Sequence, residues 1–230
     1  MIEHIARAYD TDLRELELKI AEMSRLNETQ IVQAIEALTK RDVALAKQVI
    51  AADDQIDALQ REIEEKAVAA IARRQPMAID LRAIVGALRI SSDLERIGDL
   101  AETLARRAVL LNGETHIDDV VLQLQRMAQL ALAQLTRVTQ SYERRDDAAA
   151  LEVWRKDQEI DALHNSMFRE LLTYMIENPR NITFCTHMLF CAKGIERIGD
   201  HLTNVAETVY YIVHGHTLLT ERPHVELNSK

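Results

Sequence analysis

The sequence predicts an all-α protein built from tandem duplicated three-helix bundles, six long helices in all. Three observations predict this fold class. Glycine and proline are scarce, with 6 Gly and 3 Pro in 230 residues, and a sheet-rich chain needs many more such turn residues. Apolar residues recur at helical spacing through most of the chain. A pattern of the first half also returns in the second half.

The first half contains three helical stretches. The first is expected over 12–40 and the second over 43–74, because an Arg-Asp pair interrupts the apolar spacing between them. Pro76 ends the second stretch, since proline disfavours helix in the preceding residue and starts the next helix well. The third helix continues to Asn112-Gly113, a typical C-terminal stop.

The second half repeats this arrangement. Helices are expected over 117–144, 147–177 and 180–214, with breaks at a second Arg-Asp pair and at Asn178-Pro179. Both breaks have the same residue chemistry as those of the first half. The second half therefore has the same order of helices and turns as the first.

An internal repeat is visible when the two halves are compared. Ile56–Leu59 recurs as Ile160–Leu163, and Glu95–Asp99 recurs as Glu196–Asp200 at nearly the same offset. This duplication predicts a first repeat over 1–113, a second repeat over 114–216 and a flexible C-terminal tail over 217–230.

Composition restricts the class of protein. The chain has 37 acidic and 28 basic residues, a net charge of −9, so its field repels nucleic-acid phosphates and anionic membranes. Cys185 and Cys191 lack metal or redox spacing and are expected to be reduced core thiols. The N-terminus is charged, and no apolar run is long enough for a signal peptide or membrane span. A cytoplasmic protein is expected, without nucleic acid as a partner.

Four acidic pairs lie on the helices that flank the two proline turns. Within each pair the residues are four positions apart, so both lie on one face of a helix. The first repeat carries Asp53/Asp57 and Glu95/Asp99, and the second carries Asp157/Asp161 and Glu196/Asp200.

Distances along the chain predict that these pairs face each other. Asp57 lies as far before Pro76 in the sequence as Glu95 lies after it. Asp53 and Asp99 are likewise equidistant from that proline. In antiparallel helices, residues equidistant from the turn lie at one height, since each residue advances by about 1.5 Å. In the second repeat the corresponding separations from the proline differ by a single position.

Four facing carboxylates repel one another unless they are protonated or bridged by a cation, and oxygen ligands suit hard ions. The arrangement therefore predicts one metal site per repeat, for Fe, Mn, Mg or Zn. Any single pair could instead be a solvated helix face, paired with Arg96 or Arg197. Gly98 and Gly199 interrupt helices at the same level, which indicates either close approach to the site or close helix packing.

Catalytic patterns are missing from the sequence. Asp161 and His164 resemble half of a di-iron carboxylate site. The repeat counterpart of His164 is Gln60, so a structural histidine is the better interpretation. No phosphate-cradling glycine loop and no nucleophile–His–Asp pattern is present. The sequence offers no catalytic residues.

Three segments of the chain carry a family resemblance: Asp80–Arg82, Asp93–Ala101 and its second copy Ile195–His201. Through these segments the chain resembles the PhoU family of accessory regulators of bacterial phosphate-specific transport. The resemblance covers about residues 5 to 214, and the Glu-Arg-Ile-Gly-Asp motif occurs twice. Family members bind metal clusters through paired E/D-x-x-x-D motifs, which match all eight carboxylates named above.

The resemblance implies a cytoplasmic, usually dimeric regulator that is not an enzyme. Such a protein restrains phosphate uptake and keeps the phosphate-starvation (Pho) regulon off when phosphate is plentiful. Its implied partners are the phosphate-sensing histidine kinase and the ATPase subunit of the phosphate ABC transporter, so that it meets the membrane only through them.

Two other interpretations remain open at this point. The first is a carboxylate-bridged metalloenzyme acting on phosphoesters or oxygen, because bridged metals can activate water. The second is a helical scaffold whose acids only keep it soluble. Turnover by metal-loaded protein that is abolished by Glu95→Ala plus Glu196→Ala would favour the enzyme. The scaffold predicts that alanine at Asp99 and Asp200 leaves both stability and signalling unchanged.

Overall fold

The computed structural model describes residues 2–74, 77–113 and 117–218, and these form six α-helices. The helices are α1 (Ile2–Lys40), α2 (Val43–Arg74), α3 (Ile79–Leu110), α4 (Asp118–Arg144), α5 (Asp147–Glu177) and α6 (Ile182–His214), with a short 3₁₀ turn, η1 (Pro179–Asn181), before α6. The described residues contain no strand. The all-α prediction is confirmed.

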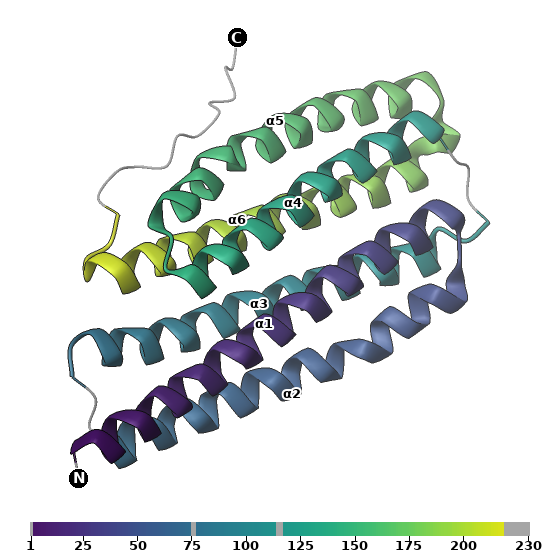
Figure 1. The fold of residues 1–230 in the computed structure, drawn as a ribbon. Coiled ribbons are helices and arrows are strands. Elements are labelled where there is room, and N and C mark those ends of the chain that lie inside the picture. Colours follow the sequence, from purple (N-terminus) through teal and green to yellow (C-terminus); the bar gives the residue numbers. More distant parts are fainter. Residues whose placement is uncertain (1, 75–76, 114–116, 219–230) are drawn as a thin grey trace.

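The helices form two three-helix bundles that lie side by side (Figure 1). Helices α1, α2 and α3 pack together, as do α4, α5 and α6, and the bundles join where α3 packs on α6 and α1 on α4. The apolar seams of all six helices form one continuous core. In the described part of the chain, α2 and α5 contact only helices of their own bundle.

The same turn closes the first hairpin of each bundle. Arg41 and Arg145 adopt left-handed backbone conformations, with φ of 58° and 55°. The aspartate that follows then caps the next helix: Asp42 accepts a hydrogen bond from the Leu45 amide and Asp146 from the Ala149 amide, both at 2.9 Å. Such caps fix where a helix begins. The register of α2 on α1 therefore matches that of α5 on α4.

The predicted helix limits agree closely with the structure, with one exception. The first helix begins at Ile2, well before the predicted start at Asp12. No glycine or proline precedes Asp12, so nothing in the sequence stops the helix from extending. Pro76 and residues 219–230 of the predicted tail lie outside the described residues, as do residues 114–116 at the predicted domain boundary.

Both cysteines are buried free thiols, as expected. Burial raises the pKa of the Cys191 thiol to about 12. None of the helices in the described ranges is long and apolar enough to cross a membrane.

Candidate metal centres

The first aspartate of the pair on α2 and of the pair on α5, Asp53 and Asp157, is called the inner aspartate of its repeat. Each inner aspartate lies against a glycine of the facing helix. A Cβ atom placed on Gly98 of α3 would be 3.1 Å from Oδ1 of Asp53 and 2.9 Å from Cδ1 of Ile56. On Gly199 of α6 it would be only 2.6 Å from Oδ1 of Asp157. Both glycines therefore permit close approach of a carboxylate. The sequence left two explanations for these glycines, close approach to the site or close packing of helices. The structure shows that one contact between the helices does both.

All four predicted carboxylates of the first repeat interact electrostatically. Burial raises the pKa of Asp53 to about 6, and the negative charges of Glu102, Asp99 and Asp57 add to the rise. The pKa of Glu95 is also raised, first by burial and then by Asp99 and Asp57. The two helices thus bring together the residues that the distances from the proline predicted to face each other.

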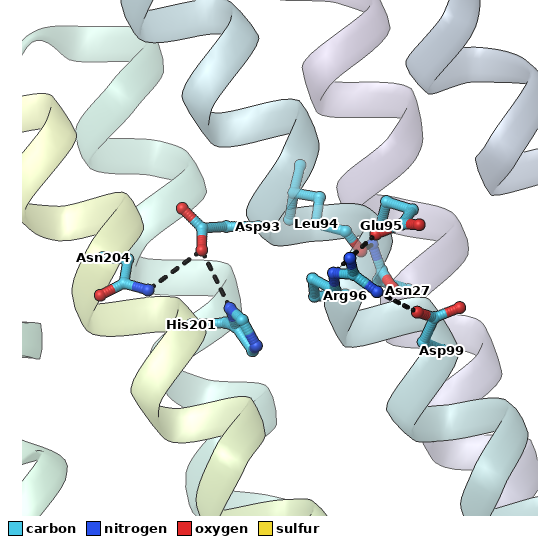
Figure 2. Close-up of polar contacts among 8 residues, drawn as sticks. All are labelled: Asn27, Asp93, Leu94, Glu95, Arg96, Asp99, His201 and Asn204. Carbon is cyan, nitrogen blue, oxygen red and sulfur yellow. Dashed lines mark hydrogen bonds and ion pairs between the residues drawn. The ribbon is translucent and has the colours of Figure 1, made fainter.

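Positive side chains offset part of this repulsion. Arg96 lies between the two acids of its own helix, with Nη1 3.1 Å from Oδ2 of Asp99 and Nε 3.5 Å from Oε2 of Glu95 (Figure 2). Arg106 pairs with Glu102 at 2.5 Å. Both arginine side chains are 60% exposed, so water screens these ion pairs and each contributes little stability.

The second repeat buries the first of its four carboxylates more deeply than the first repeat does. Asp157 is only 5% exposed. Glu196 pairs with Nζ of Lys193 at 2.5 Å. His164 lies near both Glu196 and Asp161: burial lowers its pKa, and the two acids partly oppose that effect. Asp161 and Glu196 therefore both act electrostatically on one imidazole.

Besides its four predicted carboxylates, each site has one further polar side chain, and this side chain differs between the two repeats. Glu102 in the first repeat is replaced by Thr203 in the second, whose hydroxyl donates to the backbone oxygen of Asp200 at 2.7 Å. The imidazole of His164 in turn stands where the first repeat has Gln60. The first site offers five carboxylates, and the second offers four carboxylates with an imidazole beside them.

The carboxylates face each other without being arranged as a finished ligand set. Within the residues that the structure describes, no group of three His, Cys, Asp or Glu side chains stands ready to hold an ion. Like charges repel at this spacing, and Arg96 and Lys193 draw Asp99 and Glu196 toward themselves. What the donors offer chemically is oxygen ligation of a hard cation.

Sequence reasoning did not identify the contact between the two bundles. His201 is partly buried, with Nδ1 2.9 Å from Oδ1 of Asp93. The same oxygen accepts a hydrogen bond from Nδ2 of Asn204 at 3.1 Å. Asp93 points toward α6, whereas Glu95 and Asp99 lie on the other side of α3 (Figure 2). No spacing within one repeat could have predicted a contact between repeats.

A side chain of α1 hydrogen-bonds to the backbone of α3 next to the first site. Asn27 is fully buried, and its Nδ2 donates to the backbone oxygen of Leu94 at 2.9 Å and to that of Met23 at 3.2 Å. The contact ties α1 to α3 directly beside Glu95 (Figure 2). It fixes the position of the helix turn that presents this carboxylate.

Comparison with known proteins places both bundles in one family. The model of the PhoU domain matches residues 20–108 and 124–209. A phosphate-specific transport system accessory protein PhoU homolog of Rhizobium meliloti is 48% identical over 226 residues, which cover 98% of this chain and 95% of that protein. A homolog of the same name from Caulobacter vibrioides is 42% identical over the full length of both chains.

Solved structures agree with this similarity. The crystal structure of PhoU from Pseudomonas aeruginosa matches with a TM-score of 0.86 and 36% identity, covering 90% of this chain and 100% of that one. The phosphate transport system regulatory protein PhoU from Streptococcus pneumoniae matches with a TM-score of 0.84 and 25% identity, covering 91% of this chain and 99% of that one.

Proposed function

The chain belongs to the PhoU family, and on that premise we propose that it is a non-enzymatic accessory regulator of a phosphate-specific transport system. The observation that carries the proposal is similarity along the whole molecule: a relative that bears this name is 48% identical over 98% of the chain. The similarity extends through both repeats.

The regulator would act by contact with other proteins. Its proposed partners are the phosphate-sensing histidine kinase and the ATPase subunit of the phosphate ABC transporter, and it would work as a homodimer on the cytoplasmic side of the membrane. Through them it would limit phosphate uptake and keep the Pho regulon off in high phosphate. The described helices expose apolar side chains such as Leu18, Val68 and Ile176 beside their charged residues, which gives several surfaces for such contacts.

We also propose that the facing carboxylates of each repeat hold metal ions. The residues are Asp53, Asp57, Glu95 and Asp99 in the first site, and Asp157, Asp161, Glu196 and Asp200 in the second. The raised pKa of Asp53, caused by burial and three neighbouring carboxylates, supports the fit, because a cation would relieve that repulsion. When bound, the cation supplies positive charge that joins the two helices of each hairpin.

The regulatory proposal is tested in a deletion strain. Removing the gene should raise alkaline phosphatase expression in phosphate-rich medium, and the wild-type gene on a plasmid should restore repression. Unchanged phosphatase in the deletion strain would overturn the proposal. Adding back a Glu95→Gln/Asp99→Asn/Glu196→Gln/Asp200→Asn variant then separates regulation from metal binding.

The metal proposal is tested by element-resolved analysis of protein purified without chelators. Glu95→Gln/Asp99→Asn should remove the metal of the first site alone, and Glu196→Gln/Asp200→Asn that of the second. Equal trace metal in the wild type and in both variants would refute metal binding. Sustained hydrolysis of a phosphoester by the loaded protein, abolished in both variants, would favour the metalloenzyme over the regulator.

A further inference from the structure

Each repeat buries one glutamine in its first helix. Gln30 of α1 is 3% exposed and Gln134 of α4 is 6% exposed. Their separation along the chain equals that between Asp53 and Asp157. A buried glutamine is uncommon, and here it occurs at the same position of a duplicated unit.

Both glutamines lie at the level of the inner aspartate. Gln30 is as far before Arg41 in the sequence as Asp53 is after Asp42. Gln134 and Asp157 have the same spacing on either side of the Arg-Asp pair of the second repeat. Because the two turns have the same geometry, each antiparallel hairpin sets its glutamine opposite its aspartate.

Contacts of the two side chains agree with this placement. The amide of Gln30 lies close enough to Asp53 to lower the pKa of that carboxyl, against the larger effect of burial. Gln134 lines a cavity of about 120 Å³ together with Val153, which is one turn before Asp157 on α5. Each glutamine thus faces the helix that carries the inner carboxylate.

Most of the hydrogen-bonding capacity of these two amides is unused in this conformation. Within the described ranges, neither Oε1 nor Nε2 of Gln30 has a hydrogen-bond partner, and Oε1 of Gln134 also lacks one. Burying an amide without partners is unfavourable, and an apolar side chain of similar shape would avoid that penalty. Stability of the core alone therefore does not explain a glutamine at this position in both repeats.

We propose that Gln30 and Gln134 are positioning residues that orient the inner carboxylates, Asp53 and Asp157, toward a bound cation. The inference rests on the metal proposal above. An amide N–H that donates to one carboxylate oxygen holds the side chain in one orientation and leaves the other oxygen free for the ion. Hydrogen bonds of this kind behind metal ligands raise metal affinity.

The chemistry of the amide suits this role. A lysine at the same level would compete with the cation, and a glutamate would add to the repulsion among the carboxylates. Glutamine donates a hydrogen bond without changing the charge of the site. Gly98 of α3 and Gly199 of α6 lie against the inner aspartates, so that the amide and the glycine together define the position of each carboxylate.

The test replaces each glutamine by methionine, which keeps the length of the side chain and removes its polar atoms. Mn²⁺ alone and Zn²⁺ alone are titrated into metal-free protein by calorimetry, and the melting temperature of the metal-free protein is measured beside each titration. We expect Gln30→Met to weaken ion binding at the first site roughly 10–100-fold. The metal-free variant should melt at the same temperature as the wild type or higher.

Control variants distinguish ion binding at the first site from ion binding at the second. Gln134→Met should weaken only the second site, so each variant is the control for the other, and it gives an independent test if Gln30→Met does not fold. Ser141→Ala removes a buried hydroxyl two turns along α4 from Gln134 and should leave ion binding unchanged.

The outcomes distinguish the two proposals. Wild-type affinity retained in both methionine variants would overturn the positioning role and leave the metal proposal intact. A wild type that binds neither ion would overturn both. A melting temperature that falls while affinity is unchanged would assign the glutamines a packing role only.

Discussion

Two glycines of α6 are expected to respond in opposite ways to alanine. A Cβ atom on Gly194 would be 3.5 Å from Cδ2 of Leu104, an ordinary contact. On Gly199 it would be 2.6 Å from Oδ1 of Asp157 and 3.2 Å from Cδ1 of Ile160. Both glycines are buried in the interior of the same helix, so their helix propensity and solvent exposure are matched.

The magnitudes follow from these contacts. Alanine is favoured over glycine by about 1 kcal/mol inside a helix, and at Gly194 nothing opposes that gain. At Gly199 the buried Asp157 carboxylate must move, and overpacking of this kind costs roughly 1–3 kcal/mol. The propensity gain is common to both variants. Gly194→Ala should therefore be more stable than Gly199→Ala by about 1–3 kcal/mol.

Urea unfolding of metal-free protein provides the assay. The midpoint should rise for Gly194→Ala and stay level or fall for Gly199→Ala, with similar m-values if only the native state has changed. An equal gain in both variants would refute the reasoning, because it would mean that the Asp157 carboxylate is not held against α6.

Three further predictions concern titration, capping and thiol chemistry. Folding raises the pKa of Asp53 to about 6 from 3.8, so this carboxyl lowers the stability of metal-free protein progressively as the pH rises from 3.8 to about 6, and the full penalty persists above that pH. Asp53→Asn should therefore melt above the wild type at pH 7, and this advantage should shrink as the pH falls to 5; a constant difference would contradict the shift. Asp146→Ala loses the 2.9 Å bond from the Ala149 amide and should lose about 1 kcal/mol, visible as a lower urea midpoint; an unchanged midpoint would mean that the cap contributes nothing. Cys185 and Cys191 are buried and should react with a thiol reagent only after unfolding, so rapid labelling without urea would show that α6 opens.

The sequence was enough to predict the helices and the level at which the carboxylates meet. Both predictions depend on turn residues that occur in each half of the sequence. An Arg-Asp pair marks the first turn of each repeat, and a proline marks the second. With the turns placed, counting along the chain gave the heights of Asp53 and Asp99, because each helical residue advances by a fixed rise. The metal itself stays a prediction.

Other features could not be predicted because they depend on packing between helices. Apolar periodicity indicates which positions are buried. A polar residue such as Gln30 interrupts that pattern, so the pattern does not assign it to the core. Its burial becomes visible only once α1 lies against α2. The pairing of His201 with Asp93 depends in the same way on how the bundles meet, and sequence distances within one repeat contain no information about that contact.

The peripheral position of α2 and α5 has a kinetic consequence. In the described residues each contacts only the other helices of its own bundle, yet together they carry half of the eight carboxylates. Elements with few neighbours open locally at lower free energy than the rest of a fold. Backbone amides of α2 and α5 should therefore exchange with solvent faster than those of α3 and α6. An ion could then enter or leave either site through a brief excursion of one outer helix, while the inner helices keep the two halves joined.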